Sequence, residues 1–227
     1  MSEAQDNSRQ EIRREILAAA LRAVPFDGWS ADALASGVEA AVRTGVDPAQ
    51  ARGAFPGGAK QLLEFFMAEA DREMTAAAAA QGLAEGPVRE RIGNIVRLRL
   101  KNLAPHKESI RRALALQMLP GRTPGAMRGL YRTVDAIWRA AGDDSTDFNY
   151  YSKRALLAAV YGSTLLRWLD DDSEDCAETW EFLERRIADT LRIGKVRRRA
   201  GKLLHRLPSP LPALTRLRYG RRPHSAA

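Results

Sequence analysis

The stretch that decides the fold is residues 12–66, which read IRREILAAALRAVPFDGWSADALASGVEAAVRTGVDPAQARGAFPGGAKQLLEFF. Apolar residues recur at helical spacing between short turns, the first of them at 24–28. Ser30 has the position of an N-cap, and Asp47 combines an N-cap with the proline that follows it. The helices predicted in this part of the chain cover 9–23, 31–43, 48–54 and 58–80.

The rest of the chain continues the helical pattern after a glycine-rich break at 82–87. Alternating β-branched segments, typical of strands, are missing, while Ala, Leu, Arg and Glu are abundant. The further predicted helices cover 88–102, 105–118, 124–141, 147–170 and 174–193, with Ser173 as the cap of the last. The sequence therefore predicts an all-α protein of nine or ten helices.

Charge is distributed unevenly over the 227 residues, whose net charge is +8. Residues 191–227 hold 11 basic and no acidic residues, while residues 1–190 hold 25 basic and 28 acidic ones. A nearly neutral body thus carries a strongly basic tail, which favours an anionic partner such as lipid or nucleic acid. The single cysteine, Cys176, cannot form an internal disulfide, which indicates a reducing compartment.

The tail has leucines among its cations, a composition typical of a helix that lies in a membrane interface. A disordered basic tail without a specific target is the alternative, and DNA binding by the tail is less favoured because leucines recur in it. No signal peptide and no segment of about 20 apolar residues is visible. The expected location is the cytoplasm, at the inner face of a bacterial inner membrane. The residues expected to bind the membrane are Lys195, Arg197, Arg198, Lys202, Leu203, Leu204 and Leu207.

Catalytic and metal-binding motifs are missing from the sequence. It has no phosphate-binding glycine loop, no C-x-x-C and no Glu-x-x-His pair, and its three histidines lie far apart. We therefore expect no enzyme activity, no cofactor and no metal site. The acidic run at 170–172 is interpreted as a loop and a helix start rather than as a metal site.

Residues 142–151, GDDSTDFNYY, are the nearest approach to a catalytic cluster. Their carboxylates lack a base or metal partner, so helix-start chemistry is the preferred interpretation, with Asp147 as the N-cap. We expect Phe148 to face the core and Tyr150 to face outward toward a partner.

The first four predicted helices resemble the N-terminal domain of TetR-type repressors. Gly28-Trp29-Ser30 stands at the first turn, Ala54-Phe55 at the aromatic end of the helix-turn-helix, and Lys60-Gln61-Leu62-Leu63 at the start of the fourth helix. The recognition helix would begin with Asp47, where phosphates call for basic or hydroxyl residues, and Arg52 is its one long cation. We therefore expect a TetR-like fold with a degenerate helix-turn-helix that has lost DNA binding.

A second resemblance covers residues 28–193. The motifs lie in order along the chain, and they are Arg97-Leu98-Arg99-Leu100, Arg112-Ala113-Leu114-Ala115-Leu116, Met118-Leu119-Pro120, Val134-Asp135-x-x-Trp138, Ser145-Thr146-Asp147-Phe148-Asn149, Tyr151-x-x-Arg154-Ala155 and Thr179-Trp180-x-Phe182-Leu183. With these motifs the chain resembles the lipid-binding accessory family of coenzyme Q biosynthesis, the Coq-nine proteins.

This resemblance implies a dimeric auxiliary protein with a TetR-like fold. It implies that the C-terminal domain binds isoprenoid lipid, that a C-terminal amphipathic helix contacts the membrane, and that the partner is the di-iron demethoxyubiquinone hydroxylase. The residues expected to contact lipid are Ile95, Leu98, Leu114, Leu116, Met118, Met127, Leu130, Leu156, Val160 and Leu165. For each of them, plain core packing is the alternative.

The surface expected to bind the partner joins one face of helix 124–141 to the first turns of the next helix. It comprises Asp135, Trp138, Tyr150, Tyr151 and Arg154. The alternative is that Trp138 and Tyr151 belong to the core and that Asp135 pairs internally with Arg154.

Three parts of the chain follow from these observations: an N-terminal helical domain at 1–57, a lipid-binding and dimerisation domain at 58–193, and a basic tail at 194–227. The favoured function is to bind isoprenoid or quinone lipid and present the demethoxyubiquinone intermediate to the hydroxylase at the membrane. The alternatives are a TetR-family repressor and a membrane scaffold that acts through the tail alone.

Overall fold

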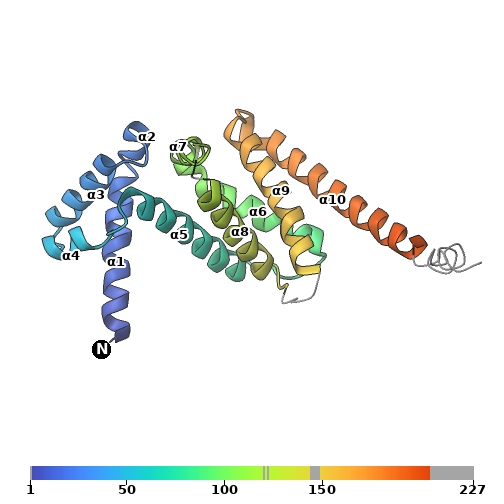
Figure 1. The fold of residues 1–227 in the computed structure, drawn as a ribbon, viewed down its shortest axis with the longest axis horizontal. Coiled ribbons are helices and arrows are strands. Elements are labelled where there is room, and N and C mark those ends of the chain that lie inside the picture. Colours follow the sequence, from blue (N-terminus) through green and yellow to red (C-terminus); the bar gives the residue numbers. More distant parts are fainter. Residues whose placement is uncertain (1, 120, 122, 144–148, 205–227) are drawn as a thin grey trace, which may run out of the picture. The chain divides into compact units, whose positions relative to one another are not determined.

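A computed structural model describes residues 2–119, 121, 123–143 and 149–204, with side chains except at 2–4, 123, 149–150 and 191–204. Within these ranges the chain is helical and contains no strand, which confirms the all-α prediction (Figure 1). The predictions for Asp147 and Phe148 lie outside the described residues, as does that for the Tyr150 side chain. None of the described helices is long and apolar enough to span a membrane.

The N-terminal helices begin where their caps predict. The Oγ atom of Ser30 accepts a hydrogen bond from the Ala33 amide (3.1 Å), and Oδ1 of Asp47 accepts from the Ala49 and Gln50 amides (3.0 and 2.9 Å). The expected turn at 24–28 contains one helical turn instead, with Pro25 in its first turn, where its missing amide hydrogen costs nothing. These elements are α1 (Ser2–Ala20), α2 (Val24–Asp27), α3 (Ala31–Arg43), α4 (Pro48–Gly53) and α5 (Gly58–Ala80).

The later elements match the predicted ranges within a few residues, except that the last helix extends beyond 193. Pro105 lies in a 3-10 turn that separates two of them. The elements are α6 (Val88–Leu103), η1 (Ala104–His106), α7 (Lys107–Gln117), α8 (Thr123–Ala140), α9 (Asn149–Leu169), η2 (Glu174–Cys176) and α10 (Ala177–Leu204).

The chain divides into two compact units, 1–187 and 188–227. The first unit contains α1–α9 and the start of α10. In the second unit, the structure describes the helical backbone as far as Leu204. The division of the body at residue 57 stays a prediction.

Close packing joins α1 to α3 through a glycine. A Cβ atom on Gly37 would lie 2.6 Å from the Ile16 carbonyl oxygen, so no larger residue fits without moving one of the helices. Trp29, just before α3, stacks against Phe66 of α5 with ring centroids 5.3 Å apart. Its indole Nε1 donates to the Ser109 carbonyl oxygen of α7 (2.9 Å), which ties the N-terminal helices to the rest of the body.

A buried ion pair joins four helices of the body. Arg99 of α6 is fully buried, and its Nη1 lies 2.6 Å from Oδ1 of Asp71 in α5. Its Nε donates to the Tyr161 hydroxyl of α9 (2.9 Å), while the Thr133 hydroxyl of α8 donates to Asp71 (3.0 Å). Burial lowers the pKa of Arg99, but Tyr161 and Asp71 outweigh it and raise that pKa above its ordinary value. A charge held in this way requires all four helices to be in place.

Asp171 organises the turn between α9 and α10. Its buried carboxylate accepts hydrogen bonds from the amides and the hydroxyls of both Ser173 and Thr179. Burial opposes ionisation, but these hydrogen bonds lower the pKa of Asp171 well below its ordinary value. The acidic run is therefore loop and helix-start chemistry, as predicted. Ser173, however, does not cap the turn that follows it; its hydroxyl accepts from the Glu178 amide instead.

Replacing Asp171 with Asn should lower the free energy of unfolding at pH 7 by about 1–3 kcal/mol, because the amide cannot accept the same hydrogen bonds. The folded-state pKa is depressed, so the carboxylate's contribution is complete above the unfolded pKa of about 3.9 and declines as the pH falls toward the folded value. Urea unfolding of both proteins should therefore show a smaller difference at pH 3 than at pH 7. The exposed neighbour Asp172, changed to Asn, is the control, and equal losses for both variants would contradict this role.

Candidate functional site

The predicted partner surface lies where α8 packs against α9. Arg154 of α9 donates from Nε to Oδ1 of Asp135 in α8 at 2.7 Å, and only 2% of its side chain is exposed. The other oxygen of Asp135 pairs with the exposed Arg139 at 2.8 Å. The internal pairing considered as an alternative is therefore present, and its function here is to fix α8 against α9.

Two further charged residues complete this cluster. Nζ of Lys153 lies 2.9 Å from Oδ1 of Asp143, and it also lies 5.5 Å from the centre of the Trp138 ring. Nη1 of Arg154 lies 3.8 Å from Oδ2 of Asp143. Lys153 was not predicted from the sequence, although it stands directly before Arg154 and could have been included by that position.

The aromatic members differ in their exposure. Trp138 is half-buried, whereas Tyr151 has 71% of its surface exposed and so does not belong to the core. Tyr151 stands in the first turn of α9, just before Lys153 and Arg154, and an exposed aromatic ring among charged residues has the composition of a binding hot spot. Residues Asp135, Trp138, Tyr151, Lys153 and Arg154 are called the α8–α9 surface below.

The ten residues predicted to contact lipid do not share one environment. Ile95, Val160 and Leu165 are buried in the core. Half-buried residues pack against its edge, namely Leu98, Leu114, Leu116 and Leu130. Met118, Met127 and Leu156 are exposed. Their common role in lipid binding stays a prediction.

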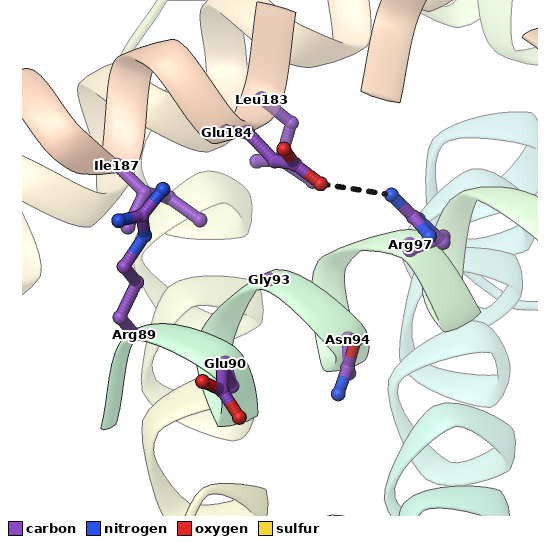
Figure 2. Close-up of a pocket in the computed structure, with 8 residues that line it drawn as sticks. All are labelled: Arg89, Glu90, Gly93, Asn94, Arg97, Leu183, Glu184 and Ile187. Atoms are coloured by element: carbon purple, nitrogen blue, oxygen red, sulfur yellow. Dashed lines mark ion pairs between the residues drawn. The ribbon is translucent and has the colours of Figure 1, made fainter. Parts of the chain in front are cut away.

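A pocket of about 270 Å³ lies between α6 and the first turns of α10, and none of those ten residues lines it (Figure 2). Gly93 leaves room at its centre, since a Cβ atom there would contact Ile187 at 3.4 Å. Arg97 pairs with Glu184 at 3.6 Å across one end and stacks over the Trp180 ring at 5.2 Å. The wall formed by Leu183 and Ile187 is apolar and the rim is charged, which suits an amphiphilic molecule. The complete lining is Arg89, Glu90, Gly93, Asn94, Arg97, Leu183, Glu184 and Ile187.

This pocket was not predicted from the sequence, because its lining residues come from two segments about 90 residues apart. The available signal was the recurrence of Arg89, Gly93 and Arg97 on one face of the predicted helix, with the glycine in the middle. In the described ranges, no three histidine, cysteine or carboxylate residues gather in a way that could hold a metal ion.

Replacing Arg154 with Met should lower the free energy of unfolding by about 1.5–3 kcal/mol, because the half-buried Asp135 and Asp143 lose their contacts with a buried guanidinium and keep only Arg139 and Lys153. Arg139→Met is the matched control, since it contacts the same Asp135 from an exposed position and should cost about 1 kcal/mol or less. Urea unfolding measures both. A loss for Arg154→Met no larger than that for Arg139→Met would show that the ion pair does not hold α8 to α9.

Comparison with solved structures identifies the fold. A TetR transcriptional regulator from Nitrosomonas europaea superimposes with a TM-score of 0.62 over 80% of this chain and 98% of the regulator. The two sequences are 23% identical, so the likeness concerns the fold alone. The predicted TetR-like architecture is confirmed.

Comparison with sequences identifies the family. Family models match at residues 123–194, described as COQ9, and at residues 10–39, described as the N-terminal domain of ubiquinone biosynthesis protein COQ9. The human ubiquinone biosynthesis protein COQ9 is 36% identical over 194 residues, 82% of this chain and 60% of that protein. The Drosophila melanogaster protein of that name is 32% identical over 188 residues, 80% of this chain and 56% of the relative. The chain spans about 60% of the length of these relatives. It belongs to the COQ9 family of ubiquinone biosynthesis proteins.

Proposed function

We propose that this protein is a lipid-binding auxiliary protein of ubiquinone biosynthesis. It binds isoprenoid or quinone lipid and presents the demethoxyubiquinone intermediate to a di-iron hydroxylase at the membrane, without catalysing the step itself. The observation that carries the proposal is the match along 82% of the chain to a protein named for ubiquinone biosynthesis.

The apolar side chains at the edge of the core support the lipid part of this proposal. Leu98, Leu114, Leu116 and Leu130 remain half-buried while packing against buried residues. A polyprenyl chain laid against them would remove further apolar surface from water, at about 25 cal/mol per Å². The apolar wall and charged rim of the α6–α10 pocket provide a second amphiphilic surface.

The α8–α9 surface supports the proposal that the protein binds the hydroxylase. Tyr151 is exposed at the start of α9, and ion pairs from Lys153 to Asp143 and from Arg154 to Asp135 join this part of α9 to α8 and the residues after it. A rigid aromatic surface loses little conformational entropy on binding, which is why such residues dominate protein interfaces. The hydroxylase is the partner proposed for this surface.

The basic tail supports the proposal that the protein binds a membrane surface. Residues 191–227 contribute eleven positive charges and no negative ones, and α10 runs through the first of them as far as Leu204. Each cation near an anionic leaflet contributes about 1 kcal/mol. We place the protein at the inner face of a bacterial inner membrane, as a homodimer.

The simplest test of the proposed function is to analyse the lipids in an organic extract of the purified protein. Mass spectrometry of that extract should find co-purified isoprenoid or quinone lipid, because a dry apolar site retains its ligand through purification. A lipid-free preparation that also fails to bind added quinone would contradict the proposed function.

Replacing Tyr151 with Ala should weaken binding to the hydroxylase by about 30-fold, which corresponds to a hot-spot loss of about 2 kcal/mol. Leu166→Ala is the matched control, since Leu166 is another exposed large side chain of the same helix. Titration calorimetry with the purified hydroxylase measures both affinities. Equal affinities for the two variants would exclude Tyr151 from the interface.

A further inference from the structure

Exposed apolar side chains gather where α7 ends and α8 begins. Met118 and Leu119 follow the last residue of α7, and Met127 and Tyr131 lie in the first half of α8. Nine large hydrophobic side chains are exposed among those that the structure describes, and four of them fall within these 14 residues. Together with Arg128, these residues are called the α7–α8 corner.

Burial of side chains changes along the length of α8. Val134 and Ile137 are fully buried and form the inner face of the helix. Met127 and Tyr131 lie one turn apart in the first half of the helix, where none of residues 124–132 is buried, and Met127 is 59% exposed. Met118, just after α7, is 83% exposed.

The segment of sequence that contains the α7–α8 corner is basic. Between Glu108 and Asp135 the sequence has five arginines and no acidic residue. Arg111 and Arg112 pair with Glu108, and Arg132 lies 3.5 Å from Asp71, whereas Arg128 donates to the Pro124 carbonyl oxygen at 3.4 Å and pairs with no carboxylate of the described residues. The exposed apolar side chains therefore lie beside a cation whose charge is not neutralised.

We propose that the α7–α8 corner is a membrane-contacting surface that places Met118, Leu119, Met127 and Tyr131 among the headgroups of anionic lipids, with Arg128 on their phosphates. Methionine and leucine suit shallow insertion, and tyrosine suits the boundary between headgroups and acyl chains. This contact belongs to the body of the protein and is independent of the basic tail. It also does not require a bound quinone.

The test uses the full chain with Cys176→Ser, which removes the single cysteine. Met118→Cys and Met127→Cys are introduced one at a time and labelled with the fluorophore NBD, whose emission shifts to the blue in an apolar environment. Phe26→Cys and Leu166→Cys are the matched controls, because they replace apolar residues exposed by 81% and 61% outside the α7–α8 corner. Vesicles of phosphatidylcholine with and without phosphatidylglycerol are then added.

A blue shift at 118 and 127 with the phosphatidylglycerol vesicles, and none at 26 and 166, is the expected result. Adding Arg128→Glu should abolish the shift at 127, whereas Arg52→Glu on α4 should leave it unchanged. These readouts are local, so binding by the tail cannot produce them.

Unchanged emission at 118 and 127 would overturn the proposal, whether the protein sediments with the vesicles through its tail or fails to bind them. Equal shifts at all four positions would also overturn it. A shift that requires the purified hydroxylase instead of vesicles would assign the α7–α8 corner to a protein partner. A lipid-free organic extract together with the expected shifts would contradict the proposed quinone function while leaving the membrane contact supported.

Discussion

The ion pair between Asp71 and Arg99 is the constraint on which the body depends. It places a charge in the core and neutralises it only if α5, α6, α8 and α9 are all in position, since Thr133 and Tyr161 complete its hydrogen bonds. Removing one partner of such a pair leaves a charge that the interior cannot solvate. The α8–α9 surface and the half-buried leucines of α6–α8 are built on the helices that this pair holds together.

Local chemistry made the helices predictable from the sequence. Ser30 and Asp47 cap the helices that they precede, and Pro105 marks a break that the structure also shows. Contacts between residues far apart in the sequence could not be predicted in this way. Nothing in the sequence indicates that Arg99 binds Asp71 and Tyr161 rather than solvent. The pairing of Asp135 with Arg154 could be stated only as an alternative for the same reason. The left-handed backbone at Asp175 and Cys176, neither a glycine, likewise has no sequence signal.

A repressor fold and an auxiliary function are compatible in this chain. The helices of the helix-turn-helix still pack together. Gly37 allows α1 to approach α3 closely, and Asp47 caps α4. That cap places a carboxylate at the start of the helix that would meet phosphates, which opposes DNA binding. The net positive charge of the molecule comes from residues 191–227 instead, since residues 1–190 hold 25 basic and 28 acidic residues.

Lipid retention by the body alone tests the account most directly. Native mass spectrometry would compare the intact chain with one that ends at residue 190, which keeps the compact unit 1–187 and removes the basic tail. The account predicts that both forms carry isoprenoid or quinone lipid in similar proportion, because the lipid is held by the helices of the body. Lipid that disappears with the tail would contradict it and would show that the tail alone holds the ligand.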